Sequence, residues 1–230
     1  MQELCPKNSQ MLKFRRAQKE DNDKISPLIC DTVRGAAAFS VLHSSTDDIP
    51  DFFFLGEDEG AEIKSIVYDT GDEYFLIYGE EFPELFPRCE KTVMIYNKST
   101  AEAGEAQMLR GREITELYRL LSGRNMLSFD DERRYVLRLR AQNSGLAAVF
   151  GIMEDGRLVS SASVSSMNEN YALIADVYTK ENYRCRGLAR QCLMSAVEYS
   201  LEKSRIPVLL CDEKMCPYYE KAGFIIYGKM

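Results

Sequence analysis

Arginines and a glycine follow a predicted strand at residues 184–190, where a helix is predicted to begin. Arg184, Arg186 and Arg190 surround Gly187. Backbone N–H groups in the first turn of a helix have no intrahelical partner, and the helix dipole makes that end electropositive. Glycine lets the backbone approach a ligand, and arginines add charge-assisted hydrogen bonds. The segment predicts a pyrophosphate-binding turn; the alternative is an ordinary strand-to-helix turn with a solvated basic face.

Two motifs in the C-terminal part carry a resemblance to a known family. Arg184-x-x-Gly187-x-Ala189 resembles the acyl-CoA signature of the GNAT N-acetyltransferase superfamily, and residues 217–224, Pro-Tyr-Tyr-Glu-Lys-Ala-Gly-Phe, resemble its closing Tyr-x-x-x-Gly-Phe segment. The resemblance covers about residues 147–228 and is closest to bacterial proteins with two such modules in tandem. It implies an acetyl-CoA-dependent N-acetyltransferase in which a primary amine attacks the thioester directly in a ternary complex.

The resemblance also implies which residues hold the donor. In this family the pantetheine arm pairs with the edge of the strand before the glycine turn, and a strand N–H in that region polarises the donor carbonyl. The pyrophosphate would lie on backbone N–H groups of the turn, between two arginine side chains. The implied donor-binding residues are Val177, Tyr178, Thr179, Arg184, Cys185, Arg186, Gly187, Leu188, Ala189 and Asp212.

Tyr219 aligns with the family tyrosine that donates a proton to the leaving thiolate. The ordinary pKa of a tyrosine, about 10, suits a donor to a thiolate whose pKa is near 8.5. Alternatively, Tyr219 packs beside Phe224, and Tyr218 is a second candidate. Asp212 stands where many relatives have asparagine, so it would orient the pantetheine amide or the amine, or cap the helix that begins near Pro217.

The general base has no clear match. Some relatives carry a glutamate where this chain has Leu173, so Asp176 is the only carboxylate within the predicted strand. Strict alternation points Asp176 away from Val177 and Thr179, whereas a bulge would reverse its direction. Otherwise the amine arrives neutral or loses its proton through water. Cys185 has no histidine near it in the sequence, which favours a small loop residue over an acyl-carrying nucleophile.

The elements that position these residues alternate between strands and helices. Residues 150–153 and 158–165 predict a hairpin around an Asp-Gly turn, and residues 171–179 predict a third strand. Residues 189–203 predict an amphipathic helix, and residues 208–211 and 224–227 predict two buried strands. Strand, helix, strand in this order implies a parallel pair with a right-handed crossover and the glycine turn at the strands' carboxyl ends. The predicted fold class is α/β, with a mixed α+β sheet.

The N-terminal half resembles a degenerate copy of this arrangement. With a shift of 97 residues, Phe53 falls on Phe150 and Tyr74 on Tyr171, which suggests a duplication. Residues 79–87 carry acids and prolines where the second half carries arginines and glycine, so they would repel a pyrophosphate. We therefore predict two tandem GNAT-like modules, a degenerate one at residues 1–108 and a catalytic one at 109–230, with residues 98–111 as a linker. Chance matching of β-rich segments is the alternative.

Composition limits the compartment and the ligands. No stretch approaches the roughly 20 apolar residues of a membrane span, and the N-terminus lacks the pattern of a signal peptide, so we expect a cytoplasmic protein without a membrane partner. Seven cysteines without a Cys-x-x-Cys pair indicate reduced thiols. The lone histidine, His43, is far from Cys211 and Cys216 in the sequence, so we expect no metal.

Charge is unevenly distributed along the chain. Residues 1–110 carry 12 Lys and Arg against 21 Asp and Glu, a net −9, whereas residues 111–230 carry 17 against 15, a net +2. The acidic half argues against nucleic-acid binding, which needs a basic patch. It would tolerate a cationic acceptor, or it serves only to keep the protein in solution.

The leading prediction is an N-acetyltransferase that uses acetyl-CoA and a small-molecule or peptide amine. The first alternative is a CoA-binding sensor or regulatory protein that has lost turnover, since the family's glutamate base is missing. The second alternative is a structural domain without CoA.

Overall fold

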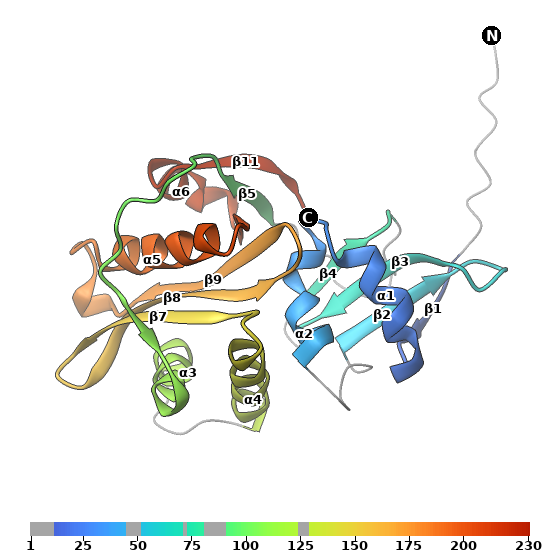
Figure 1. Ribbon diagram of the computed structural model, residues 1–230, viewed down its shortest axis with the longest axis horizontal. Helices are drawn as coiled ribbons and strands as arrows, with labels where there is room; N and C mark the ends of the chain where they lie inside the picture. The colour runs from blue at the N-terminus through green and yellow to red at the C-terminus, as the bar shows by residue number, and fades with distance from the viewer. Residues whose placement is uncertain (1–11, 45–51, 71–72, 81–90, 124–128) are drawn as a thin grey trace, which may run out of the picture.

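Two β-sheets lie side by side in the computed structural model, which describes residues 12–44, 52–70, 73–80, 91–123 and 129–230 (Figure 1). The smaller sheet has the order β1-β2-β3-β4, and the larger has the order β11-β5-β10-β9-β8-β7-β6. The chain is therefore a mixed-sheet α+β protein, as predicted. None of the helices in the described ranges has both the length and the apolar character needed to cross a bilayer.

The N-terminal unit is an antiparallel sheet with two short helices. Its core includes Ile25, Ile29, Phe53 and Leu55, all fully buried. The elements are β1 (Lys13–Arg16), α1 (Asn22–Ile29), α2 (Phe39–Ser44), β2 (Phe53–Glu57), β3 (Ile63–Asp69) and β4 (Tyr74–Tyr78).

The C-terminal unit begins with the meander that the sequence predicts. Strands β7 (Ala148–Glu154), β8 (Arg157–Met167) and β9 (Tyr171–Thr179) pair antiparallel, and β6 (Gln107–Leu109) joins β7. Helix α5 (Leu188–Glu202) connects β9 to the parallel strand β10 (Ile206–Cys211). The predicted hairpin, crossover helix and parallel pair are confirmed.

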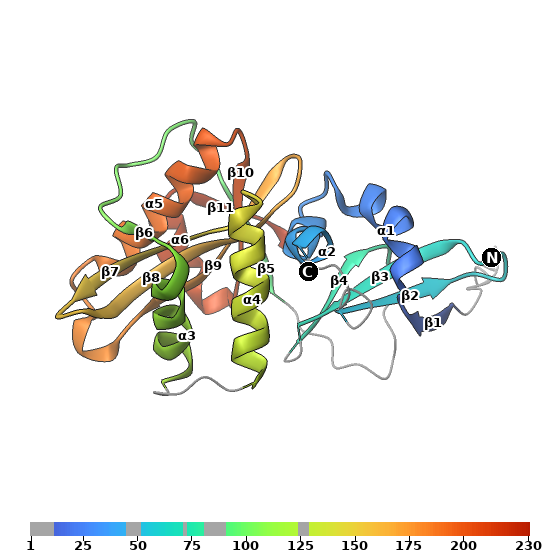
Figure 2. The same cartoon turned by 60° about the horizontal axis from the view of Figure 1, so that its bottom comes forward.

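Helices cover both faces of the larger sheet. Helix α5 lies on one face, and α3 (Ile114–Ser122) and α4 (Phe129–Asn143) lie on the other (Figure 1). Helix α4 also stands beside α2 of the N-terminal unit (Figure 2). The chain then continues through α6 (Cys216–Lys221) to β11 (Phe224–Lys229).

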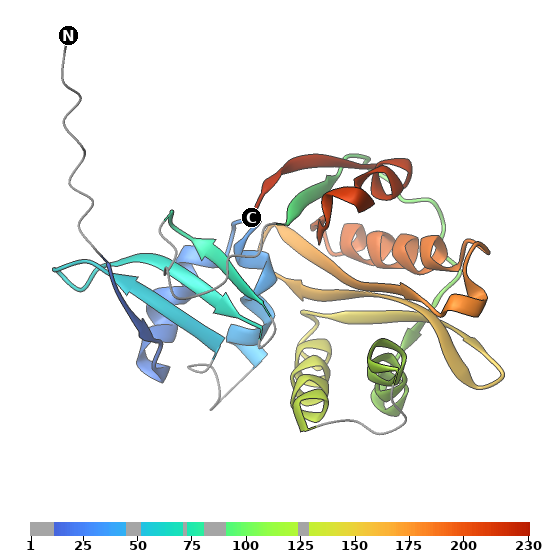
Figure 3. The same ribbon diagram turned by 180° about the vertical axis from the view of Figure 1, so that it is seen from behind.

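One strand of the larger sheet comes from the N-terminal half. Strand β5 (Thr92–Tyr96) lies between β10 and β11 and pairs antiparallel with both. Its Met94 is fully buried in the C-terminal core, whereas Val93 and the C-terminal Met230 pack into the N-terminal core. Figure 3 shows the C-terminus at the junction of the two sheets. Residues before position 108 therefore belong to the C-terminal sheet, and residues after it pack into the N-terminal core. A domain boundary at residue 108 stays a prediction.

The segment after β5 is fastened to α5. It passes outside this helix on its way to β6 and α3 (Figure 1). The Ala106 N–H donates to Ser195 Oγ at 3.2 Å, and a Cβ on Gly104 would lie 2.2 Å from the same oxygen. The predicted linker 98–111 is thus wrong in its last part, because residues 107–109 pair as β6 and turn towards α3.

The first elements of the two units have the same order: strand, two helices, three-stranded meander. The turns after β1 and β6 also close alike. The Gln18 N–H donates to Asp21 Oδ2 at 2.8 Å, and the Arg110 N–H donates to Glu113 Oε2 at 2.9 Å. The predicted acid-rich and proline-rich segment 79–87 lies mostly outside the described residues.

Candidate functional site

Strands β9 and β10 separate towards their carboxyl ends. Their parallel register ends at Ile174 and Leu209, although β9 continues to Thr179. On its other side β10 stays paired with β5 as far as Cys211. Residues 175–179 therefore keep β8 as a neighbour but lose β10, which leaves one strand edge available to an added extended chain.

A bulge interrupts β9 at the same place. Ser161 faces Tyr178 and Ser163 faces Ala175, so two steps along β8 correspond to three along β9. Asp176 has a φ of 54°, a left-handed conformation that non-glycine residues rarely adopt. The predicted condition for Asp176 is therefore met: β9 has a bulge here, so the side chain of Asp176 need not follow strict alternation.

Serines of β8 hold the bulge in place. Ser161 Oγ donates to the Asp176 carbonyl at 2.8 Å, and Ser160 Oγ donates to the Tyr178 carbonyl at 3.0 Å. Ser163 Oγ bonds the Asp176 carboxylate. The serine hydroxyls thus give the carbonyl groups of Asp176 and Tyr178 hydrogen-bond partners at the point where the ladder is irregular.

The Asp176 carboxylate is also paired with a guanidinium. Arg138 Nη2, on α4, lies 3.1 Å from Asp176 Oδ2, and Arg138 Nη1 donates to Ser163 Oγ at 3.1 Å. The two charged side chains are 15% and 20% exposed. Asp176 would have to release Arg138 before it could accept a proton from an amine.

Side chains of the predicted strand edge alternate between the two faces. Val177 packs against the core on the α5 side, and Tyr178 packs against the cluster formed with α3. Thr179 is buried, with its Oγ1 2.7 Å from Ser160 Oγ. Arg184 Nε donates to the Thr179 carbonyl at 3.3 Å, so this guanidinium lies at the end of β9.

The glycine turn presents free backbone N–H groups. Cys185 and Gly187 have φ values of 61° and 77°, and residues 184–187 are exposed. Among the described residues, none of the N–H groups from Cys185 to Arg190 donates to a backbone carbonyl. A Cβ on Gly187 would meet nothing within 4 Å. Glycine is thus required by its φ rather than by a close contact, and the space in front of the turn is open. Leu188, buried, and Ala189, half-buried, begin α5.

The other two arginines of the turn bind carboxylates of the protein itself. Arg186 Nη2 lies 2.8 Å from Glu154 Oε1 at the end of β7. Arg190 Nη2 lies 2.7 Å from Glu102 Oε2, in the segment that crosses α5, and Arg190 also donates to the Lys221 carbonyl at 3.1 Å. Two acidic side chains therefore occupy the positions that arginines would offer to a bound anion.

Two adjacent tyrosines of α6 lie near the divergent strands. Tyr219 is 8% exposed and contacts Phe224 edge to face at 6.1 Å. Burial, with smaller contributions from Tyr218 and Cys211, raises the pKa of Tyr219 to about 12. The Tyr218 hydroxyl is buried without a hydrogen-bond partner among the described residues. A buried unpaired hydroxyl is costly, so a ligand that accepts its hydrogen bond would be stabilised there.

Asp212 follows β10 and faces the N-terminal unit. Lys91 Nζ lies 3.0 Å from Asp212 Oδ1 and 3.3 Å from Glu73 Oε1. The hydrogen bond from Lys91 lowers the pKa of Asp212. Its side chain caps no helix, and the residue before α6 is Met215, so the capping alternative is wrong.

Comparison with known protein families gives a match in the C-terminal half. Residues 114–224 match the model of the Acetyltransferase (GNAT) family. The C-terminal half of the chain belongs to the GNAT acetyltransferase family. No curated protein matches the chain.

Solved structures resemble the chain over nearly its whole length. A GCN5-related N-acetyltransferase-like protein from Streptococcus suis is 15% identical, with 93% of this chain and 97% of that one aligned and a TM-score of 0.57. A GNAT-family acetyltransferase from Colwellia psychrerythraea is 9% identical, with 94% and 97% aligned and a TM-score of 0.56. At these identities the likeness concerns the fold alone. The chain spans 61% of the length of a GNAT-family protein from Novosphingobium aromaticivorans, at 20% identity, 61% coverage of this chain and a TM-score of 0.49.

Cysteines of the GNAT half are mostly buried thiols. Cys211 Sγ lies 3.9 Å from Cys216 Sγ, and burial raises the pKa of Cys211 to about 12. Cys185 alone is exposed in the turn. The described residues contain no cluster of three or more side chains that could ligate a metal ion.

Several residues of the site were not predicted from the sequence. The serines of β8 had a visible signal, since residues 160, 161, 163, 165 and 166 are all serine within one strand. Arg138 had none, because it reaches Asp176 from a helix 38 positions earlier in the chain.

Proposed function

We propose that this GNAT protein transfers the acetyl group of acetyl-CoA to a primary amine, by direct attack in a ternary complex. The observation that carries the proposal is the open turn around Gly187. Its N–H groups are unused by backbone carbonyls, and the turn directly follows a strand edge that lacks its neighbour. Successive N–H groups in such a turn form a concave anion-binding nest at a helix N-terminus.

The donor would be held by backbone and side chains together. The pyrophosphate would lie on N–H groups of residues 185–189, with the guanidinium groups of Arg184 and Arg186 beside it. The pantetheine arm would pair with the free edge of residues 177–179. The unpaired Tyr218 hydroxyl supports this fit, because an oxygen atom of the bound acetyl-CoA would accept its hydrogen bond. Asp212, which forms an ion pair with Lys91, would lie beside the pantetheine arm.

The chemistry needs positioning more than a strong acid. The amine nitrogen attacks the thioester carbon, the C–S bond breaks, and the sulfur leaves as a thiolate while the nitrogen loses a proton. Tyr219, with a pKa of about 12, stays protonated at neutral pH. Complete proton transfer to a thiolate with a pKa near 8.5 is uphill, so Tyr219 would stabilise it chiefly through a hydrogen bond. A proton from water would complete the thiol.

Asp176 is the candidate base. It lies at the bulge, beside the strand edge that would hold the donor, and its pairing with Arg138 fixes its orientation. If it accepts the amine proton, Asp176→Asn should lower kcat. If the amine arrives neutral, the same variant should change kcat little.

The N-terminal half is, in this proposal, a degenerate GNAT-like module at residues 1–108 that shapes the acceptor side of a catalytic module at residues 109–230. Support comes from the shared order of elements and from neighbours of similar fold that span both halves. Contacts between the halves also support it. The Ser40 N–H donates to Ser166 Oγ at 2.8 Å, and Asn168 Nδ2 donates to the Thr32 carbonyl at 2.8 Å.

Thermal stabilisation by acetyl-CoA tests donor binding. We expect stabilisation at micromolar ligand that is lost in Arg186→Glu and retained in Arg112→Glu, a matched exposed arginine of the same half. No stabilisation at millimolar acetyl-CoA would contradict any CoA-dependent function.

A CoA-binding sensor is the second candidate. Its support is that Asp176 is held by Arg138 and that apolar Leu173, at the position of the relatives' glutamate, is buried. Release of free thiol from acetyl-CoA with a broad amine panel separates the two: an enzyme releases thiol, whereas a sensor binds acetyl-CoA and releases none.

A further inference from the structure

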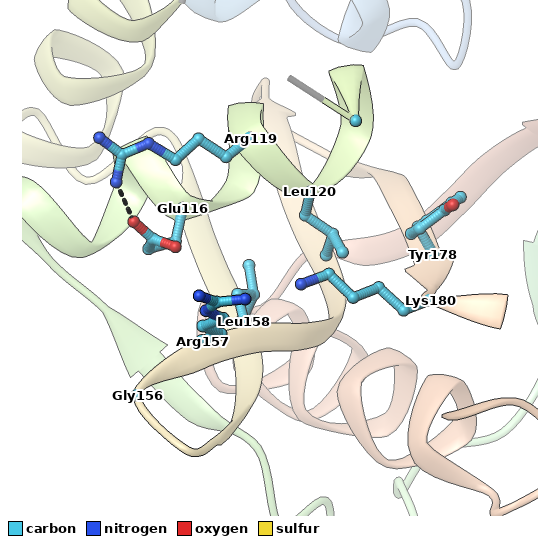
Figure 4. Close-up of a pocket in the computed structure, with 9 residues that line it drawn as sticks. Glu116, Arg119, Leu120, Gly156, Arg157, Leu158, Tyr178 and Lys180 are labelled. Carbon is cyan, nitrogen blue, oxygen red and sulfur yellow. Dashed lines mark hydrogen bonds and ion pairs between the residues drawn. The ribbon is translucent and has the colours of Figure 1, made fainter. Parts of the chain in front are cut away.

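A cavity of about 480 Å³ opens on the sheet face opposite α5. It lies between α3, the β7–β8 hairpin and the end of β9 (Figure 4). Leu120 and Leu158 form its apolar part, and charged side chains surround them: Glu116, Arg119, Arg157 and Lys180. The lining is mostly polar, and several charged groups converge over a small apolar base, so the cavity suits a small polar or charged ligand.

The charges of this cavity are unbalanced. Glu116 is hydrogen-bonded to Arg119, so this pair is neutral (Figure 4). Arg157 and Lys180 form no ion pair with a carboxylate in the described part of the chain, and their charged ends point towards each other near Leu158. Like charges that converge beside an apolar wall repel each other, and an anion between them would remove that repulsion.

The cavity adjoins the strand that is proposed to hold the donor. Tyr178 lines it, and its neighbours in the strand, Val177 and Thr179, supply the edge for the pantetheine arm. The glycine turn leads into α5, whereas Tyr178 packs on the α3 side. A ligand in the cavity would therefore reach the thioester from the face opposite the donor, and the two substrates would not compete for space.

We propose that this cavity holds an anionic group of the amine acceptor, a carboxylate or a phosphate, between Arg157 and Lys180. This inference rests on the proposed acetyl transfer. The acceptor amine would extend along β9 to the bulge at Asp176. Two to four strand residues separate the cavity from the bulge, so the amine and the anionic group would lie roughly 7 to 13 Å apart. The acceptor class is thus an extended amino acid or amino phosphate rather than a polyamine.

Matched acceptor pairs test the charge requirement. The carboxylate arm compares 6-aminohexanoate with 6-aminohexanamide, and the phosphate arm compares 5-aminopentyl phosphate with 5-aminopentanol. We expect a kcat/KM preference of about tenfold for at least one anionic member, since charge-assisted hydrogen bonds are worth this much. The arm with the larger preference identifies the anion. Equal rates within both pairs would overturn the inference while leaving the acetyl transfer intact.

The double variant Arg157→Gln/Lys180→Gln locates the effect. Both side chains reach the surface, so the variant should fold normally. We expect its KM for the preferred anionic acceptor to rise about tenfold, with unchanged kcat and unchanged stabilisation by acetyl-CoA. Arg112→Gln, an exposed arginine outside the cavity, is the control and should change nothing. Equal loss for the anionic and neutral acceptors would contradict the inference.

A binding measurement separates this inference from the proposed function. Ligand-observed NMR with the same four compounds needs no turnover. Binding of an anionic probe to the wild-type chain and not to the double variant would support the cavity even if no acetyl transfer occurs. Turnover of amines without any such binding difference would support the transferase and overturn the cavity's role.

Discussion

The third meander strands of the two halves, β4 and β9, occupy the same place in their meanders but end differently. Both are irregular near their carboxyl ends, since β4 also contains a register shift against β3. The register shift of β4 falls between Leu76 and Tyr78, and the residue it leaves without a partner in β3 is the buried, apolar Ile77. The irregular part of β9 contains Asp176, which is paired with Arg138, and it leads into the open glycine turn. The scaffold alone therefore does not make a ligand site; the residues at the end of the strand do.

The largest effect is expected at the Asp176–Arg138 pair, which has no counterpart in β4. Arg138→Met would leave a mostly buried carboxylate without its cation, a change that costs about 3 to 5 kcal/mol in similar sites. Urea unfolding measures the loss. Arg140→Met, on the same helix but exposed, is the control and should change the free energy of unfolding little.

The double variant Arg138→Met/Asp176→Asn sharpens this prediction. Asparagine keeps the hydrogen bond with Ser163 and tolerates the left-handed conformation of residue 176, and it carries no charge. We expect it to restore at least half of the stability lost in Arg138→Met. A double variant as unstable as the single one would show that packing, not charge, sets the role of Arg138.

The next effect concerns β5, the strand that the N-terminal half contributes to the C-terminal sheet. Met94→Ala should destabilise the protein by about 2 to 5 kcal/mol, because Met94 is fully buried between β10 and β11. We expect both halves to lose stability together in urea, as monitored by circular dichroism. Met215→Ala, at a partly exposed methionine, is the control. Two separate transitions, with only one shifted, would contradict the view that β5 couples the halves.

Two glycines with left-handed φ compare the strand ends directly. Gly79, after β4, has a φ of 81°, and a Cβ there would lie 2.0 Å from the Lys64 carbonyl oxygen. Gly187 has a φ of 77° and open space around it. Gly187→Ala should therefore cost only the backbone strain, about 1 to 2 kcal/mol, and Gly79→Ala should cost more. Acetyl-CoA binding should weaken only in Gly187→Ala. Equal weakening in both variants would contradict a donor site confined to the C-terminal half.

Local signals made the C-terminal meander, α5 and the glycine turn predictable. The Asp-Gly hairpin turn, the amphipathic period of residues 189–203 and the arginines around Gly187 all act within a few residues of each other. The place of β5 was not predictable in this way. It pairs with residues 208–211, more than 110 positions away, and nothing in a short apolar strand selects its partner. The Arg138–Asp176 pair and the unpaired Tyr218 hydroxyl were hidden for the same reason, since tertiary packing alone creates them.

The smallest effect concerns the carboxylates that bind the arginines of the turn. Glu154 holds Arg186 at 2.8 Å in an exposed pair, and such pairs contribute little to stability. Glu154→Gln should therefore leave the urea midpoint nearly unchanged. It should strengthen acetyl-CoA binding by about twofold to fivefold, because Arg186 would no longer have to break its ion pair with Glu154 before it binds a phosphate. Isothermal titration with acetyl-CoA measures the change, and Glu198→Gln, on the far part of α5, is the control. Weaker binding in Glu154→Gln would mean that the carboxylate positions Arg186 for the donor instead of competing with it, so the sign of this effect decides which role Glu154 has.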